Sequence, residues 1–229
     1  IRSDESPAET IALLDDQMAS SRFRGVRTMG VDPGGVPHVD VLRALTERNL
    51  VFDLMVHPDV LAQAAGTLAN HPDLTVVVEH VGWPRSADPD EHTLWRAGID
   101  ALAALPQVHC KLSGLSMPLA TMDAEAFRPW ISHALEVFGP DRCMFASNFP
   151  VDSTHGSFDD LYTTFDVLTA DLDDADRTKV FATRDATDFR WLELPAPDEP
   201  IVPPTSRKRS AGDPLAALQQ FHRAARDAC

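Results

Sequence analysis

Short apolar segments alternate with longer amphipathic segments along most of this chain. The short segments are rich in Val, Leu and Phe and are bounded by polar or turn-forming residues, as buried strands are. The longer segments repeat apolar residues three and four positions apart, the spacing of a helix with one buried face. We predict strands over residues 23–29, 51–57, 74–81, 108–112 and 143–148. We predict helices over residues 7–20, 39–48, 58–70, 90–105, 124–138, 157–170 and 173–183.

This alternation favours a parallel α/β sheet, because each helix returns the chain to the same end of the sheet. A repeat of roughly 25–35 residues suits either an open, flavodoxin-like doubly wound sheet or a (β/α) barrel. A closed barrel needs eight strand–helix units and about 250 residues, and the pattern here supplies too few strands to close one. No glycine-rich phosphate loop follows a predicted strand, and Gly34 and Gly35 lie in a DPGG turn, so nucleotide binding is not indicated.

The chain changes character after Leu194. Residues 195–212 begin PAPDEPIVPPTSRKRS, a proline-rich polar segment that predicts an extended linker. Residues 213–229 carry a single apolar stripe at helical spacing, which predicts a helical tail. We therefore expect a barrel-like domain over 1–194, a linker over 195–212 and a helical tail over 213–229.

Composition and charge narrow the class of partner. The 229 residues are 44% hydrophobic and 24% charged, which is typical of a globular protein, and no apolar run approaches the ~20 residues of a membrane span. The net charge of -15 argues against nucleic-acid and anionic-membrane surfaces, which need clustered Lys and Arg. The three cysteines, Cys110, Cys143 and Cys229, are few and far apart, so we expect buried thiols in a reducing cytoplasm and not a disulfide framework.

Polar side chains gather where the predicted strands end, which is where parallel α/β folds place their ligand sites. The set indicates a pocket for a small molecule. Its members are Arg27, His57, Glu79, His80, Lys111, Ser113, Asn148 and Asp152.

Several of these residues also have a purely structural explanation. Arg27 could anchor an ion pair, and His57 could cap the helix that begins at Pro58. Because neighbours on a strand alternate, we expect Glu79 to point to the opposite face from His80. A lysine inside an apolar strand, as at Lys111, is costly unless its ammonium group reaches polar partners at the rim.

Several segments resemble, in order, those of a known family. VVVEHVGWP is similar to the "DHxGxP" strand end of the amidohydrolase-related TIM-barrel hydrolases. VHCKLSGL resembles the "KLSGL" strand of that family, and DRCMFASNFPVD resembles its last strand, written "RxxFGSDWP". FRGVR and LVFDLMVHPDVL match the preceding strands, so the resemblance runs over residues 22–194.

The resemblance implies a (β/α)8 barrel to which this chain contributes about strands four to eight. It implies a hydrolase that opens a lactone or similar cyclic ester of a small carboxylate or sugar acid, although zinc-dependent decarboxylases are related. Some members use a divalent metal, zinc or manganese, for which the imidazoles of His80 and His57 would be the available ligands. It assigns catalysis to His80, Lys111, Asn148 and Asp152, and substrate contacts to Arg27, His57, Trp83 and Ser113.

Two departures from the family pattern affect these expectations. The family's first strand carries a His-x-His pair, which this sequence lacks, so we expect the N-terminal strands to be missing and the site to be half complete. The carboxylate of "SDWP" is an amide here, Asn148, which cannot act as a general base. Asp152 could replace it if the loop after Pro150 folds back. A non-catalytic remnant remains an alternative, and open sheet edges predict association, such as a homo-oligomer.

Overall fold

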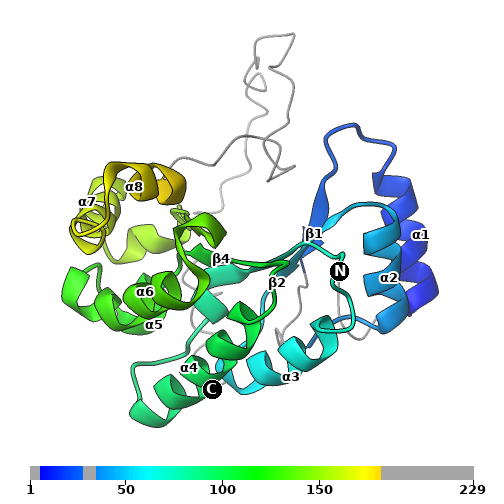
Figure 1. Ribbon diagram of the computed structural model, residues 1–229. Helices are drawn as coiled ribbons and strands as arrows, with labels where there is room; N and C mark the ends of the chain where they lie inside the picture. The colour runs from blue at the N-terminus through cyan, green and yellow to red at the C-terminus, as the bar shows by residue number, and fades with distance from the viewer. Residues whose placement is uncertain (1–5, 28–34, 182–229) are drawn as a thin grey trace, which may run out of the picture. The chain divides into compact units, whose positions relative to one another are not determined.

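A single parallel sheet forms the centre of the fold. The structure is a computed structural model that describes residues 6–27 and 35–181. The strands follow one another in chain order, so each pairs with the next along the sequence (Figure 1). They are β1 (Gly25–Arg27), β2 (Val51–Leu54), β3 (Val76–Val78), β4 (Val108–Leu112) and β5 (Cys143–Phe145).

Helices occupy the intervals between strands, close to where the spacing of apolar residues predicts them. Acidic and hydroxyl residues define several N-termini: Asp88, Asp123 and Ser157 each accept a hydrogen bond from a backbone N–H of the following turn. The helices are α1 (Pro7–Gln17), α2 (Val39–Glu47), α3 (Pro58–Leu68), α4 (Pro89–Ala103), α5 (Ser116–Leu119), α6 (Ala124–Phe138), α7 (Phe158–Leu168) and α8 (Asp174–Phe181).

The two faces of the sheet have different neighbours. Alternate strand residues, including Phe52, Val78 and Cys110, belong to the main hydrophobic core together with the buried faces of the helices. The residues between them on the strands, Val51 and Val77, form a separate small cluster on the other face. The described helices therefore cover one face of the sheet, as in a barrel wall, whereas an open doubly wound sheet has helices on both faces (Figure 1). The predicted barrel-type α/β fold is confirmed, here as a five-stranded part of the wall.

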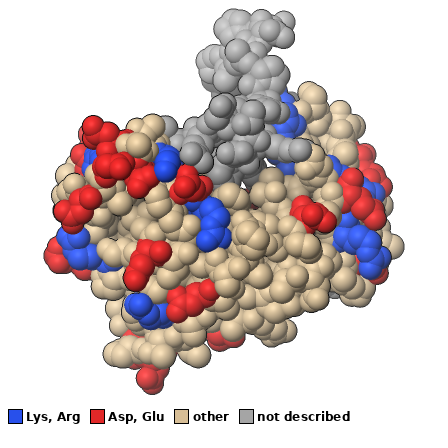
Figure 2. Space-filling view, viewed as in Figure 1, with Lys and Arg blue, Asp and Glu red and all other residues tan. Residues whose placement is uncertain are grey.

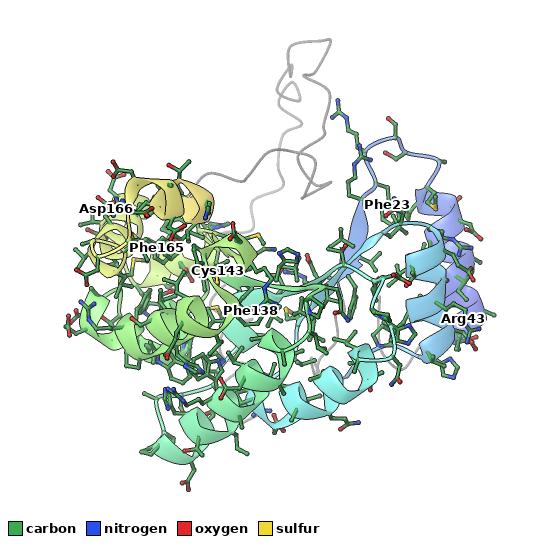
Figure 3. The ribbon with its side chains drawn as sticks, in the orientation of Figure 1. Phe23, Arg43, Phe138, Cys143, Phe165 and Asp166 are labelled. Atoms are coloured by element: carbon green, nitrogen blue, oxygen red, sulfur yellow. The ribbon has the colours of Figure 1, made fainter. Side chains whose placement is uncertain are left out.

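Aromatic side chains fill the end of this core near β5. Phe145 of β5 stacks on Phe165 of α7, with ring centroids 4.0 Å apart. Phe138, Cys143 and Phe165 lie among the helices that follow β4 (Figure 3). Cys143 is the register partner of Cys110, and both are buried free thiols, as the sequence predicts.

Other expectations are met only in part. The strand expected over 74–81 ends at Val78, and Glu79–Gly82 forms the 3-10 turn η1 instead. The predicted linker and helical tail, and Cys229, lie outside the described residues. In the described part of the chain, β1 and β5 each pair with a strand on one side only. No helix in that same part combines the length and the apolar character that crossing a bilayer requires.

The contact between α3 and α4 depends on a glycine. A Cβ atom at Gly98 would lie 2.3 Å from the Cβ of Leu61, which has no room to move because it belongs to the core. We expect Gly98→Ala to lower the free energy of unfolding by about 1–3 kcal/mol in urea denaturation. Gly66→Ala in α3 is the matched control: its Cβ would meet nothing within 4 Å, so its greater helix propensity should give a gain of up to about 1 kcal/mol. Equal effects of the two changes would contradict this account.

Candidate functional site

Three ionisable side chains meet on the face of the sheet away from the helices. Asp53 lies on β2, Glu79 follows β3, and Lys111 lies on β4. The Lys111 ammonium group donates a hydrogen bond to Glu79 Oε1, and its Nζ lies 3.9 Å from Asp53 Oδ2. Parallel pairing of adjacent strands brings these groups together although they are distant in sequence.

Asp53 is a site residue that the sequence reasoning missed. The available signal was an acidic residue inside the otherwise apolar segment VFDLMV. Burial raises the pKa of Asp53 to about 7; the Lys111 charge opposes this rise, and the Glu79 charge adds to it. Its Oδ1 is buried without a hydrogen-bond partner, which a neutral carboxyl group tolerates better than a carboxylate does.

Glu79 carries the negative charge of this cluster. Burial opposes its ionisation, but the Lys111 ammonium group outweighs burial and lowers the pKa of Glu79 below its usual value. The neighbouring Asp53 and Glu79 side chains act in opposite directions, because each raises or lowers the pKa of the other: Glu79 raises that of Asp53, and Asp53 lowers that of Glu79. Below about pH 7 the three groups thus combine one neutral carboxyl group, one carboxylate and one ammonium group.

His80 is a neutral imidazole next to this cluster. Its Nδ1 lies 2.9 Å from Ser113 Oγ, within hydrogen-bonding distance. Burial lowers the pKa of His80 to about 4; the Lys111 and Arg27 charges act in the same direction, and the Glu79 charge opposes them. A neutral imidazole can accept a proton at one nitrogen while it donates from the other.

The expectation that Glu79 and His80 point to opposite faces is wrong. His80 Nδ1 lies 4.0 Å from Glu79 Oε2, so both side chains belong to one cluster. Strand alternation ends at Val78 because His80 and Val81 adopt left-handed backbone angles, with φ of 51° and 54°. Gly114 makes room for the displaced ring, since a Cβ there would lie 2.7 Å from His80 Nδ1.

His57 and Trp83 form one wall beside His80. His57 stands immediately before α3, but its side chain does not cap the helix; its Nδ1 lies 2.9 Å from the carbonyl oxygen of Trp83. The rings of His57 and Trp83 stack with centroids 4.7 Å apart, and the Trp83 ring meets His80 edge-on at 6.2 Å. Burial lowers the pKa of His57, so this imidazole is also neutral near pH 7.

The loop after β5 folds back, as the use of Asp152 requires. Asn148 Nδ2 donates a hydrogen bond to Asp152 Oδ1 at 2.8 Å, and the Phe149–Pro150 peptide bond between them is cis. Asp152 is completely buried, and burial raises its pKa, although the nearby Ser116 and Asn148 side chains oppose the shift. Among the described residues, no hydrogen bond connects this pair to the Asp53–Glu79–Lys111 cluster, so it forms a second polar group.

Arg27 ends β1 in register with Asp53, and its charge acts on both Asp53 and His80. The structure therefore brings four sequence-predicted residues together near the carboxyl ends of the strands: Arg27, His80, Lys111 and Ser113. Glu79 and Asp53 lie beside them. Their roles remain predictions.

On the face shown in Figure 2, acidic and basic side chains are interspersed, with no broad basic patch.

The described residues do not fit a divalent metal by themselves. In residues 6–27 and 35–181, no three His, Cys, Asp or Glu side chains are placed to share an ion. The Glu79 carboxylate already binds the Lys111 ammonium group, and His57 Nδ1 is held by a backbone carbonyl. We therefore derive no chemical step through a metal.

The family model described as "Amidohydrolase" matches residues 3–183. An uncharacterised protein of Sinorhizobium fredii is 31% identical over 192 residues, which cover 78% of this chain and 64% of that protein. An L-fucono-1,5-lactonase of Burkholderia ambifaria is 29% identical over 70% of this chain and 56% of its own length. This chain thus spans less than two thirds of either relative.

A solved structure shares the arrangement of strands and helices. It is a Burkholderia multivorans amidohydrolase with bound zinc, 28% identical, with a TM-score of 0.67 over 76% of this chain and 67% of that chain.

Proposed function

Because this chain belongs to the amidohydrolase family, we propose that it acts as a hydrolase that opens the ring of a small lactone. The substrate class would be the lactone of a sugar acid or of another small carboxylate. Relatives named as L-fucono-1,5-lactonases support this choice, at 29% and 35% identity. We further propose a small-molecule substrate in the cytoplasm, and self-association of the protein.

The observation that carries the proposal is the neutral imidazole of His80. It lies within hydrogen-bonding distance of Ser113 and close to the Lys111 ammonium group. In lactone hydrolysis, a water oxygen attacks the carbonyl carbon, and the ring C–O bond then breaks. His80 would take the proton from the attacking water and return it to the leaving ring oxygen. Lys111 would stabilise the negative charge that develops on the carbonyl oxygen, and Arg27 would hold a substrate carboxylate.

A second carboxylate is available at the end of β5. Asn148 lacks a basic group, but its amide fixes Asp152 at 2.8 Å. We assign Asn148 to positioning, and Asp152 to a supporting role as a base when substrate binding brings water to it. His57, Trp83 and Ser113 would form the wall that contacts the substrate. Zinc in a related structure makes a metal dependence worth measuring, although no step here requires one.

The test is a proton-release assay on the full chain with a panel of aldono-1,5-lactones, corrected for spontaneous hydrolysis and run with and without added zinc. We expect enzyme-dependent ring opening, and we expect Ser113→Ala to reduce kcat/KM about tenfold because the loss of one hydrogen bond leaves His80 less well oriented. The conservative Ser113→Thr change should keep most of the activity. No lactone opening above the blank would contradict the proposal, and CO2 release from aromatic acids would favour a decarboxylase.

A further inference from the structure

The surroundings of Lys111 are unequal on its two sides. An ammonium group has three N–H donors, and Glu79 Oε1 occupies one of them. Asp53 Oδ2 lies 3.9 Å from Lys111 Nζ, which is too far for a hydrogen bond. A small movement of either side chain would allow the bond to form. The Lys111 side chain is 24% exposed, whereas those of Glu79 and Asp53 are 4% and 8% exposed. The ammonium group therefore lies between a buried acidic side and an accessible side.

We propose that Asp53 is a positioning residue for Lys111. When neutral, it leaves two ammonium N–H donors to the carbonyl oxygen of a bound lactone, and when ionised it withdraws one of them. This inference rests on the proposed hydrolase function. It adds that the charge of Asp53 controls how well Lys111 stabilises the negative carbonyl oxygen.

Three charged groups face Asp53: Glu79 from the end of β3, Lys111 from β4 and Arg27 from β1. Glu79 already provides the charge that Lys111 needs, so a proton on Asp53 completes a neutral cluster. Loss of that proton would place two carboxylates against one ammonium group, and the added attraction would close the 3.9 Å gap. The pKa of Asp53, raised by burial to about 7, places this change within the working range of an enzyme.

The direction of the pH effect follows from the raised pKa. Asp53 is neutral below about pH 7, so the catalytic form of Lys111 is present there and is lost as the pH rises. On the alkaline side, kcat should fall about tenfold per pH unit. Asp53→Asn keeps the shape of the side chain but cannot ionise, so whatever its kcat at low pH, that kcat should no longer fall on the alkaline side.

A substrate-free measurement tests the coupling between Asp53 and Lys111. The sequence contains three lysines, Lys111, Lys179 and Lys208, so selective labelling of lysine Cε gives a spectrum of three signals. Loss of one signal in Lys111→Arg assigns Lys111. We expect its chemical shift to show a step near pH 7 in the parent protein, and no such step in Asp53→Asn. Asp73→Asn, an exposed aspartate in the turn before β3, carries the same change of charge and should keep the step.

The pH profile of lactone opening then tests the functional consequence. Blank-corrected rates are measured for the parent protein, Asp53→Asn and Asp73→Asn. Loss of the alkaline decline in kcat, at nearly constant KM, in Asp53→Asn but not in Asp73→Asn supports the proposal. A step in the Lys111 signal that survives Asp53→Asn overturns it, and so does an unchanged alkaline decline in that variant. Absence of all lactone opening would contradict the proposed function alone, because the lysine spectrum still decides whether Asp53 controls Lys111.

Discussion

Lys111→Met is expected to lower the free energy of unfolding by about 3–5 kcal/mol and to abolish lactone opening. Met fills a similar volume but leaves the buried Glu79 carboxylate without its cation, next to Asp53. Glu79 must then take up a proton to remain buried, so its pKa rises, and the loss of stability should be larger at pH 8 than at pH 5. Urea denaturation at the two pH values measures both effects.

The double variant Lys111→Met, Glu79→Gln separates the unpaired charge from the lost packing. It removes the uncompensated carboxylate, so it should regain much of the stability that Lys111→Met loses while remaining inactive. A Lys111→Met protein that loses less than about 1 kcal/mol would show that the ammonium group does not compensate the buried Glu79 charge.

Gly114→Ala is expected to reduce kcat/KM by about 100-fold or more, because errors of about 1 Å in catalytic geometry have effects of this size. The new Cβ would lie 2.7 Å from Nδ1 and 2.8 Å from Cγ of His80, so the imidazole must move away from Ser113. Steady-state kinetics on the same lactone measures the loss.

Gly139→Ala provides the matched control for Gly114→Ala. Both glycines have a positive φ, of 70° and 74°, which L side chains rarely adopt, but a Cβ at Gly139 meets nothing within 4 Å. Both variants should therefore lose stability from backbone strain, but only Gly114→Ala should lose activity. Full activity in Gly114→Ala would mean that the position of His80 does not limit the reaction.

Local signals were sufficient for most of the secondary structure. The helix expected over 124–138 is present with those bounds, because its apolar spacing and its N-cap, Asp123, lie within the segment itself. The parallel sheet also followed from the alternation of segments, and the barrel-type fold from the resemblance of the motifs. In these cases the determining interactions are short-range or repeat along the chain.

The end of β3 could not be derived in the same way. The turn Glu79–Gly82 is held from outside: the Trp95 indole N–H donates to the Val81 carbonyl oxygen at 2.5 Å, and Gly82 packs against Leu61. These contacts come from α3 and α4, and they override the alternation that the apolar run VVV suggests. Asp53 was missed for a related reason, because its partners Glu79 and Lys111 become neighbours only through strand pairing.

One face of the sheet packs against the helices and the other carries the ionisable side chains, and this difference has a consequence for how the sequence can change. Along β2, β3 and β4, residues that pack against the helices alternate with residues on the opposite face, where Asp53 and Lys111 lie beside the apolar Val51 and Val77, so the two sets are interleaved along the same segments. Substitutions of the polar residues on the opposite face can thus change its charge while the hydrophobic interior remains intact. We expect substitutions at Asp53, Glu79 and Lys111 to be tolerated best when the charges of the three change together, because their ion pairs link them.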